Sequence, residues 1–139
     1  MGGHSSVIHI QTQGFSDMHD LTPRAERFLA ESPVKNGIFC AFVPGATAGI
    51  TTIEYEEGAL RDLRGAIERM APQNLRYEHD SRWGDGNGFS HVRAALLGPS
   101  LSVPVAGGKL RLGTWQQIVL VDFDNRPRNR EIIFELVGE

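Results

Sequence analysis

The sequence predicts an α+β fold in which about seven mostly antiparallel strands form packed sheets, accompanied by two or three helices. The expected strands outnumber the expected helices, and most consecutive strands are joined by short turns such as Pro44-Gly45 and Ala106–Lys109. Short turns join antiparallel strands, whereas parallel strands need long crossover connections. The chain of 139 residues contains no repeat or linker, so we expect one domain that spans residues 1–139.

Composition excludes several classes of protein. Hydrophobic residues make up 40% of the chain and charged residues 22%, which is ordinary for a globular protein. The formal net charge of -3 offers no basic surface for nucleic acid. The single cysteine, Cys40, excludes an internal disulfide framework and fits a reducing compartment. Because we find neither a long apolar span nor a signal-peptide pattern, we expect a cytoplasmic protein with no membrane partner.

The first part of the chain predicts a strand and then a helix. Val7–Gln13 alternates between apolar and polar residues, which indicates a strand with one wet face. Thr22 and Pro23 suit the N-cap and the first position of a helix. Ser32-Pro33 ends this helix, because the residue before a proline disfavours helical geometry.

Two strands and a second helix follow. Ile38–Val43 is continuously apolar, which is typical of a strand buried on both faces. Thr47–Tyr55 is rich in β-branched residues and predicts the next strand. Apolar residues at helical spacing between Leu60 and Met70 then predict a helix that ends at Ala71-Pro72.

The last third of the chain is mainly extended. An Ala- and Leu-rich helix follows His91 and ends at Gly98-Pro99. Alternating apolar residues then predict strands around Leu101–Val105, Leu112–Phe123 and Ile132–Leu136.

The stretch from residue 77 to residue 91 is the first candidate site. It holds His79 and His91, two of the five histidines, together with Asp80, Asp85 and Asn87. Neutral imidazole binds metal ions and carries protons, and hard oxygen donors suit Mg²⁺ or Mn²⁺. The twelve-residue spacing of the histidines matches no zinc or calcium motif, so a capping histidine and a surface histidine remain an equal alternative.

Two further segments carry candidate binding residues. Arg126–Arg130 holds three arginines in five residues, which suits phosphate or carboxylate, although composition alone favours a solvated turn with cross-strand ion pairs. Trp115 lies beside Gln116 and Gln117, which suits the stacking and hydrogen bonding of a flat heterocycle. A core tryptophan at the start of a strand is the alternative.

Five segments together resemble a known family. Gly113–Ile118 follows a Gly-Gly turn, and Asp122–Asp124 and Arg126–Arg130 follow it. With the Thr47–Glu54 strand and the His79–His91 stretch, their order resembles the YjbQ-like family of small uncharacterised proteins over nearly the whole chain. The resemblance implies a seven-stranded α+β fold that forms a homotrimer around a threefold axis. It also implies a weak secondary activity as a thiamine-phosphate synthase.

The candidate site combines this resemblance with side-chain chemistry. Glu54, His91 and Arg128 are the expected catalytic residues, and His79, His91 and Asp85 are the expected ligands of a divalent Zn, Mg or Mn ion. The residues expected to bind substrate are Thr47, Asn87, Trp115, Gln116, Arg126 and Arg130.

The chain departs from the family pattern beside these residues. The family has a histidine where Phe89 stands, and many relatives have another at Gly45 or Ala46. A phenyl ring offers no lone pair, so we expect weak Zn²⁺ or Ni²⁺ binding that Phe89→His would tighten. The rival expectation is that Phe89 packs in the core or covers the site.

Two classes of function remain open at this point. In the first, the protein is a metal-assisted transferase that acts on a phosphorylated small molecule, with the ion and Arg128 neutralising a leaving pyrophosphate. In the second, it is a non-catalytic trimeric protein that binds a small anionic metabolite with the same residues.

Overall fold

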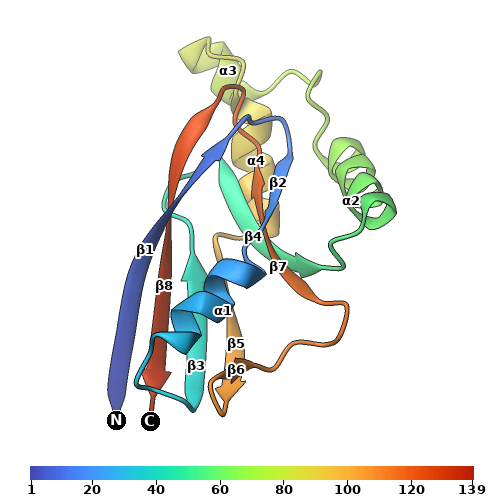
Figure 1. Ribbon diagram of the computed structural model, residues 1–139. Coiled ribbons are helices and arrows are strands. Elements are labelled where there is room, and N and C mark those ends of the chain that lie inside the picture. The colour runs from blue at the N-terminus through green and yellow to red at the C-terminus, as the bar shows by residue number, and fades with distance from the viewer.

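A computed structural model describes residues 1–139 and contains eight strands and four helices (Figure 1). In chain order the elements are β1 (Gly2–Thr12), β2 (Asp17–Asp20), α1 (Thr22–Ala30), β3 (Gly37–Phe42), β4 (Ala48–Ile53), α2 (Glu57–Met70), α3 (Glu78–Trp83), α4 (Gly88–Leu97), β5 (Ser100–Ala106), β6 (Lys109–Leu110), β7 (Gln117–Asp122) and β8 (Arg128–Gly138). None of the helices combines the length and the apolar character that a membrane span requires.

The strands form two antiparallel sheets. The larger has the order β1-β8-β3-β5-β6 and the smaller the order β2-β7-β4, and every neighbouring pair is antiparallel. This confirms the predicted α+β class. The short strands β2 and β6 and the six-residue helix α3 were not predicted, since each is too short to show a periodic pattern.

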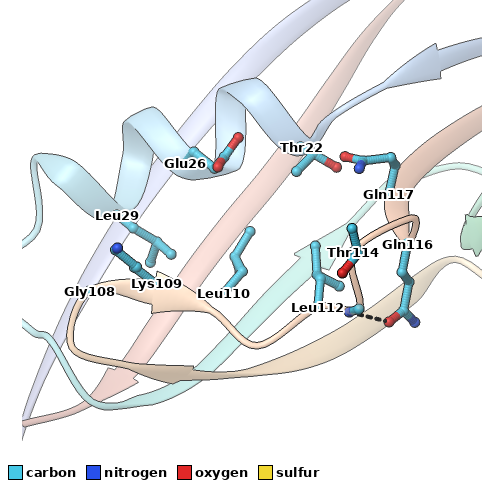
Figure 2. Close-up of a pocket in the computed structure, with 11 residues that line it drawn as sticks. Thr22, Glu26, Leu29, Gly108, Lys109, Leu110, Leu112, Thr114, Gln116 and Gln117 are labelled. Carbon is cyan, nitrogen blue, oxygen red and sulfur yellow. Dashed lines mark hydrogen bonds between the residues drawn. The ribbon is translucent and has the colours of Figure 1, made fainter. Parts of the chain in front are cut away.

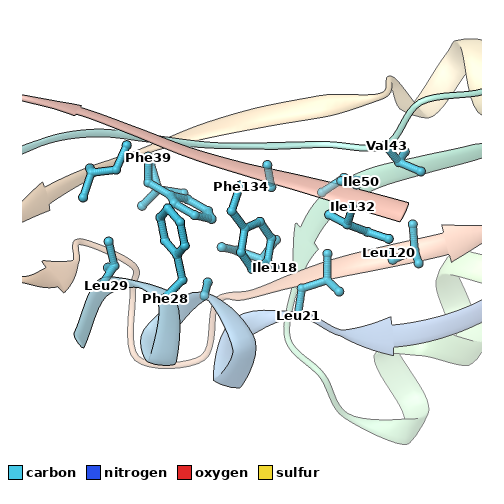
Figure 3. Packing of buried hydrophobic residues seen from close by; sticks show 14 of the residues in the cluster. Leu21, Phe28, Leu29, Phe39, Val43, Ile50, Ile118, Leu120, Ile132 and Phe134 are labelled. Atoms are coloured by element: carbon cyan, nitrogen blue, oxygen red, sulfur yellow. The ribbon is translucent and has the colours of Figure 1, made fainter. Parts of the chain in front are cut away.

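The main core lies where α1 covers one face of the larger sheet (Figure 3). Phe28 of α1 and Phe39 and Phe134 of the sheet have ring centroids 5.1 to 5.8 Å apart, within the range of favourable aromatic packing. Ile118 and Leu120 of β7 join the same cluster, so one core connects both sheets. A smaller cluster lies beneath α4 and includes Val119, Val121 and Phe123.

The opposite face of the larger sheet is uncovered, which corrects the prediction for β3. Only Phe39 and Ala41 of β3 are buried, whereas Ile38 is 52% and Phe42 39% exposed. The continuous apolar run reflects apolar residues on both faces, but α1 covers only one of them. We call the uncovered side the outer sheet face, and its apolar members are Val7, Ile38, Phe42, Ile133 and Val137.

The start of α1 also differs from the prediction. Leu21 occupies the N-cap and Thr22 lies inside the helix. The Thr22 hydroxyl accepts a hydrogen bond from the backbone N–H of Ile118 at 2.8 Å, so this side chain joins α1 to β7. Pro23 lies in the first turn as expected, because that turn has no need of its missing N–H.

Helix α2 begins with the acidic cap that its sequence favours. The Glu56 carboxylate accepts hydrogen bonds from the N–H groups of Gly58 and Ala59 at 2.7 and 2.9 Å. These bonds lower the pKa of Glu56, since they stabilise its charged form. Glu56 is therefore the N-cap residue of α2.

Candidate functional site

His79 of α3 and His91 of α4, which are twelve residues apart in sequence, lie next to each other; in Figure 1, α3 is at the top with α4 below it. The ring centroids of His79 and His91 are 4.4 Å apart. Helix α3 ends at Gly84, whose left-handed backbone (φ 66°) turns the chain back toward α4. This turn brings His79 and His91 together, as the sequence predicts.

Two carboxylates surround Nδ1 of His79. This nitrogen lies 3.3 Å from Oδ1 of Asp85 and 3.7 Å from Oδ1 of Asp80. It is buried and has no hydrogen-bond partner. One possible ligand atom from each of the three residues lies within 4.8 Å of the others, a spacing that suits a metal ion. The predicted ligands His79 and Asp85 are thus together, and Asp80 is a third donor beside them.

Backbone N–H groups orient both carboxylates. Asp80 Oδ1 accepts a hydrogen bond from the N–H of Gly88 at 2.8 Å, and Asp85 Oδ1 accepts one from Asn87 at 3.2 Å. Gly88 is required here, because a Cβ at this position would lie 2.5 Å from the Cβ of Tyr77. The loop therefore holds its acids in place before any ligand binds.

His91 is oriented on its other side by the backbone of the loop between β3 and β4. Its Nδ1 donates a hydrogen bond to the carbonyl oxygen of Ala46 at 3.1 Å, since a carbonyl can only accept. In the neutral ring, Nε2 then carries the lone pair that can bind a metal ion or take a proton. The cavity beside His91 has a volume of about 190 Å³ and a lining of small residues, which include Ala46, Ala48 and Ala94.

A buried network of acids and arginines lies next to this loop. The side chain of Asp124, which has no exposed surface, accepts hydrogen bonds from Thr47 (2.9 Å), Arg128 (2.8 Å) and Asn87 (3.3 Å). Burial alone would raise the pKa of Asp124, but the Thr47 hydrogen bond, the Arg128 hydrogen bond and charge, and the Asn125 N–H together lower it below its ordinary value. Ionised Asp124 therefore connects three of the predicted site residues, Thr47, Asn87 and Arg128, through hydrogen bonds.

Asp122 engages a fourth predicted residue. Arg130 donates to both of its carboxylate oxygens, at 2.6 and 3.0 Å, and the Thr12 hydroxyl donates to one of them. Arg130 is only 8% exposed and also bonds the Thr47 hydroxyl. The guanidinium of Arg130 is thus occupied by contacts within the protein. Arg128 is partly exposed and Arg126 is exposed.

Sequence reasoning missed the two aspartates as members of the site. Asp122 and Asp124 end an apolar strand, and they precede three arginines by a few residues. An acid in a strand that is otherwise fully buried requires a partner, and this signal predicts their pairing with the arginines.

The remaining predicted residues lie elsewhere. Glu54 follows the end of β4, whereas Thr47 precedes its start, so the length of the strand, roughly 20 Å, separates them. Trp115 lies near Glu54 and is 72% exposed. The Gln116 amide donates to Thr52 and accepts from the Gly113 N–H, so it holds a loop. The predicted site thus divides into two groups within one chain.

Phe89 is a packing residue. It is 1% exposed, stacks on Phe15 with centroids 6.3 Å apart, and lies 5.0 Å from the Arg93 guanidinium carbon. Positions 89 and 91 point about 200° apart around a helix, so Phe89 faces away from the side that carries His91. The structure therefore supports the rival expectation, that Phe89 packs in the core, and metal binding at this position stays a matter for experiment.

The largest cavity is separate from the histidines. It has a volume of about 510 Å³ and lies between α1 and the segment that leads from β6 to β7 (Figure 2). Leu29, Leu110 and Leu112 form its apolar part, and Glu26 and Lys109 lie at its margins. No predicted metal ligand lines this cavity.

Comparisons with known proteins identify relatives. The family model described as "UPF0047 protein YjbQ-like" matches residues 6–139. A UPF0047 protein of Archaeoglobus fulgidus is 38% identical over 126 residues, which cover 91% of this chain and 95% of that protein.

Solved structures agree with these matches. A YbjQ-like protein of unknown function from Sulfolobus solfataricus has a TM-score of 0.93 at 33% identity, covering 99% of both chains. A hypothetical protein from Aeropyrum pernix has a TM-score of 0.89 at 29% identity, covering 97% of this chain and 98% of that one.

Proposed function

The chain belongs to the YjbQ-like UPF0047 family, and from this premise we propose that it is a divalent-metal-dependent transferase that acts on a phosphorylated small molecule. Its reaction class would be that of a thiamine-phosphate synthase. The observation that carries the proposal is the buried Nδ1 of His79, which has no partner and lies between two carboxylates. Burying a polar atom without a partner is costly, and a bound ion would remove that cost.

The residues present fit a hard or borderline divalent ion. His79 supplies one nitrogen, and Asp80 and Asp85 supply oxygens. His91, the other predicted ligand, lies beside this group, with its ring centroid 4.4 Å from that of His79, but is not one of the three clustered donors. Mixed nitrogen and oxygen donors suit Zn²⁺, Mg²⁺ or Mn²⁺. When bound, such an ion would neutralise charge on a leaving pyrophosphate.

The other residues act around this centre. Arg128 uses Nε to bond Asp124, which leaves its terminal N–H groups for a phosphate oxygen. Arg126 is exposed beside it and adds a second positive charge. Thr47 and Asn87 orient Asp124, so they position Arg128 rather than touch substrate.

One observation favours the second candidate, a protein that binds a small anion without turnover. Glu54, the predicted acid or base, lies at the far end of β4 from His91. A single chain therefore presents the metal ligands and Arg128 without that acid. Binding needs only the former groups, whereas transfer needs a proton acceptor as well.

The outer sheet face supports a homotrimer for either function. Its apolar residues form two rows in the register of the strands, Val7 with Ile133 and Phe42, and Val137 with Ile38, with Ser5, Glu135 and Cys40 between them. Large apolar patches on a soluble chain mark interaction surfaces.

Calorimetric titration with Mn²⁺ and Zn²⁺ tests the metal centre. We expect one site per chain, with affinity reduced about tenfold or more in His79→Asn and Asp85→Asn. His9→Asn is the matched control, because His9 is an exposed strand histidine. Equal affinity in wild type and His79→Asn would overturn the metal centre.

Turnover then separates the two functions. The metal-loaded protein would be mixed with a pyrimidine pyrophosphate and a thiazole phosphate, and released pyrophosphate would be measured. Release that depends on His91 and Arg128 supports the transferase. Binding of either compound without release identifies the binding protein.

A further inference from the structure

A second pocket lies where the free edges of the two sheets face each other. β4 is an edge strand of the smaller sheet, and the far edge of β5 is paired only at Val105 and Ala106, by the two residues of β6. Between these edges is a cavity of about 340 Å³, on the opposite side of β4 from β7. It shares no residue with the histidine site.

Backbone groups on both walls point into this gap. Neighbouring residues of an antiparallel strand turn their N–H and C=O groups to opposite sides. The N–H of Ile50 donates across the gap to Gly98, so the groups of Thr52 also point away from β7. On β5, the C=O of Pro104 accepts from Arg111, so the groups of Ser102 point the same way. Thr52 and Ser102 therefore offer donors and acceptors at the edge of each sheet.

Arg111 supplies the only charge in the lining. Its side chain is exposed and forms no ion pair or hydrogen bond, and no carboxylate lines the cavity. Ile50, Val103 and Leu112 supply apolar surface beside it. A guanidinium without a partner next to unpaired strand edges is complementary to a carboxylate that is attached to an amide.

The wall around the pocket is fixed in place. The Gln116 side chain bonds the Thr52 hydroxyl and the backbone N–H of Gly113; Figure 2 shows the bond to Gly113. Gln116 lines both this pocket and the larger cavity beneath α1, so it lies between them. This bridge closes the end of the gap between β4 and the loop. The pocket thus has the size for a small ligand and not for a continuous strand.

We propose that this pocket binds the free carboxyl end of a short peptide or of an N-acylated amino acid. The carboxylate pairs with Arg111, and the amide groups bond the edges at Thr52 and Ser102. This activity is separate from the metal centre, and it does not depend on the proposed transfer reaction.

Titration of the full-length, ¹⁵N-labelled protein with N-acetylglycylglycine tests the proposal. We expect shifts of the Thr52, Ser102 and Arg111 amide signals, with those of His79 and His91 unmoved. Arg111→Gln should weaken binding by about tenfold. The C-terminally amidated peptide lacks the carboxylate, so it should bind the wild-type protein as weakly as the free-acid peptide binds Arg111→Gln.

Controls keep the outcome decisive. Arg61→Gln, on the exposed surface of α2, should leave binding unchanged. Arg111→Lys retains the charge and should bind between wild type and Arg111→Gln, which separates loss of the contact from loss of fold. Absence of shifts at millimolar peptide, equal binding of the amidated peptide, or equal displacement by inorganic phosphate would each overturn the proposal.

Discussion

Asp124 is held as an anion by neighbours that come from three separate parts of the chain. Thr47 precedes β4, Asn87 precedes α4 and Arg128 begins β8. Because the folded pKa is lower than the ordinary value of 3.8, the charged form stabilises the fold above that pH. This stability is lost as the pH falls through the folded pKa.

Asp124→Asn should therefore lower stability at neutral pH and flatten its acid dependence. The amide cannot hold Arg128 by charge, and it removes one titrating group. Urea unfolding at neutral pH and at about pH 3 measures both effects. Asp62→Asn, on the exposed face of α2, is the control and should change neither. An unchanged acid slope in Asp124→Asn would show that the network does not fix this carboxylate.

Phe89 gives a second prediction at this scale. Phe89→His should lower the free energy of unfolding by about 2 kcal/mol or more, from lost packing and a buried imidazole without a partner. Zn²⁺ affinity should not change, because the side chain faces Phe15 and Arg93. Chemical unfolding and calorimetry of the same protein measure the two quantities. Phe15→His is the matched control, since its ring is half exposed. Tighter Zn²⁺ binding in Phe89→His would return position 89 to the metal shell.

Helix α2 depends on one buried side chain at its C-terminal end. Arg93 of α4 donates from Nε to the carbonyl of Ala71 at 2.9 Å, bonds Ser16 at 3.3 Å and pairs with Glu68. Arg93 is 5% exposed, and its guanidinium joins α4 to the C-terminal end of α2 and to Ser16, just before β2, while its partner Glu68 is half exposed. Loss of the guanidinium leaves a buried carbonyl without a donor.

Arg93→Met should cost roughly 2 kcal/mol and loosen α2 more than the sheets. Hydrogen exchange measures this as faster exchange at the C-terminal end of α2, with β7 unchanged. Arg64→Met is a milder comparison, because Arg64 bonds only the Ser16 carbonyl at 3.2 Å. Equal acceleration in β7 would mean that α2 is not a separate unit of stability.

Elements with a long periodic pattern were predictable from sequence, and short or polar ones were not. The alternation within Val7–Gln13 and Ile132–Leu136 and the burial of Ala25, Phe28 and Leu29 follow from spacing alone, whereas the strand residues Gly2–Ser6 of β1 and Arg128–Glu131 of β8 were not predicted. Helix α3 has six residues and none is buried, so no apolar period exists to detect. The two-sided burial expected for β3 failed because periodicity describes side chains and not the element that covers them.

The candidate site shows the same division. His79 and His91 belong to one short polar stretch of the sequence, and their proximity there was enough to group them. The bond between Thr12 and Asp122 joins residues that are 110 positions apart, and no local pattern reports such a contact. Glu54 was grouped with them by family resemblance, which carries no distances.

At the scale of the whole molecule, the chain leaves several large apolar side chains uncovered on one face of its larger sheet. Val7, Ile38, Phe42 and Val137 are between 39% and 52% exposed there. These uncovered side chains favour assembly over a monomer, because burial of apolar surface is worth about 25 cal/mol for each Å². If copies of the chain associate through the outer sheet face, that association explains both why no helix covers this face and why β3 is apolar on both sides.

Phe42→Glu should therefore dissociate the assembly. Wild type should have three times the chain mass of 15.3 kDa by light scattering at micromolar concentration, and the variant should have the mass of one chain. The carboxylate would face the apolar surface of the neighbouring copy, where burial of an unpaired charge is strongly unfavourable. Circular dichroism should remain that of an α+β protein, because Phe42 lies outside the main core. Met70→Glu is the control, since Met70 is 66% exposed on α2 and lies away from the outer sheet face. A monomeric wild type, or equal dissociation by Met70→Glu, would contradict assembly through this face.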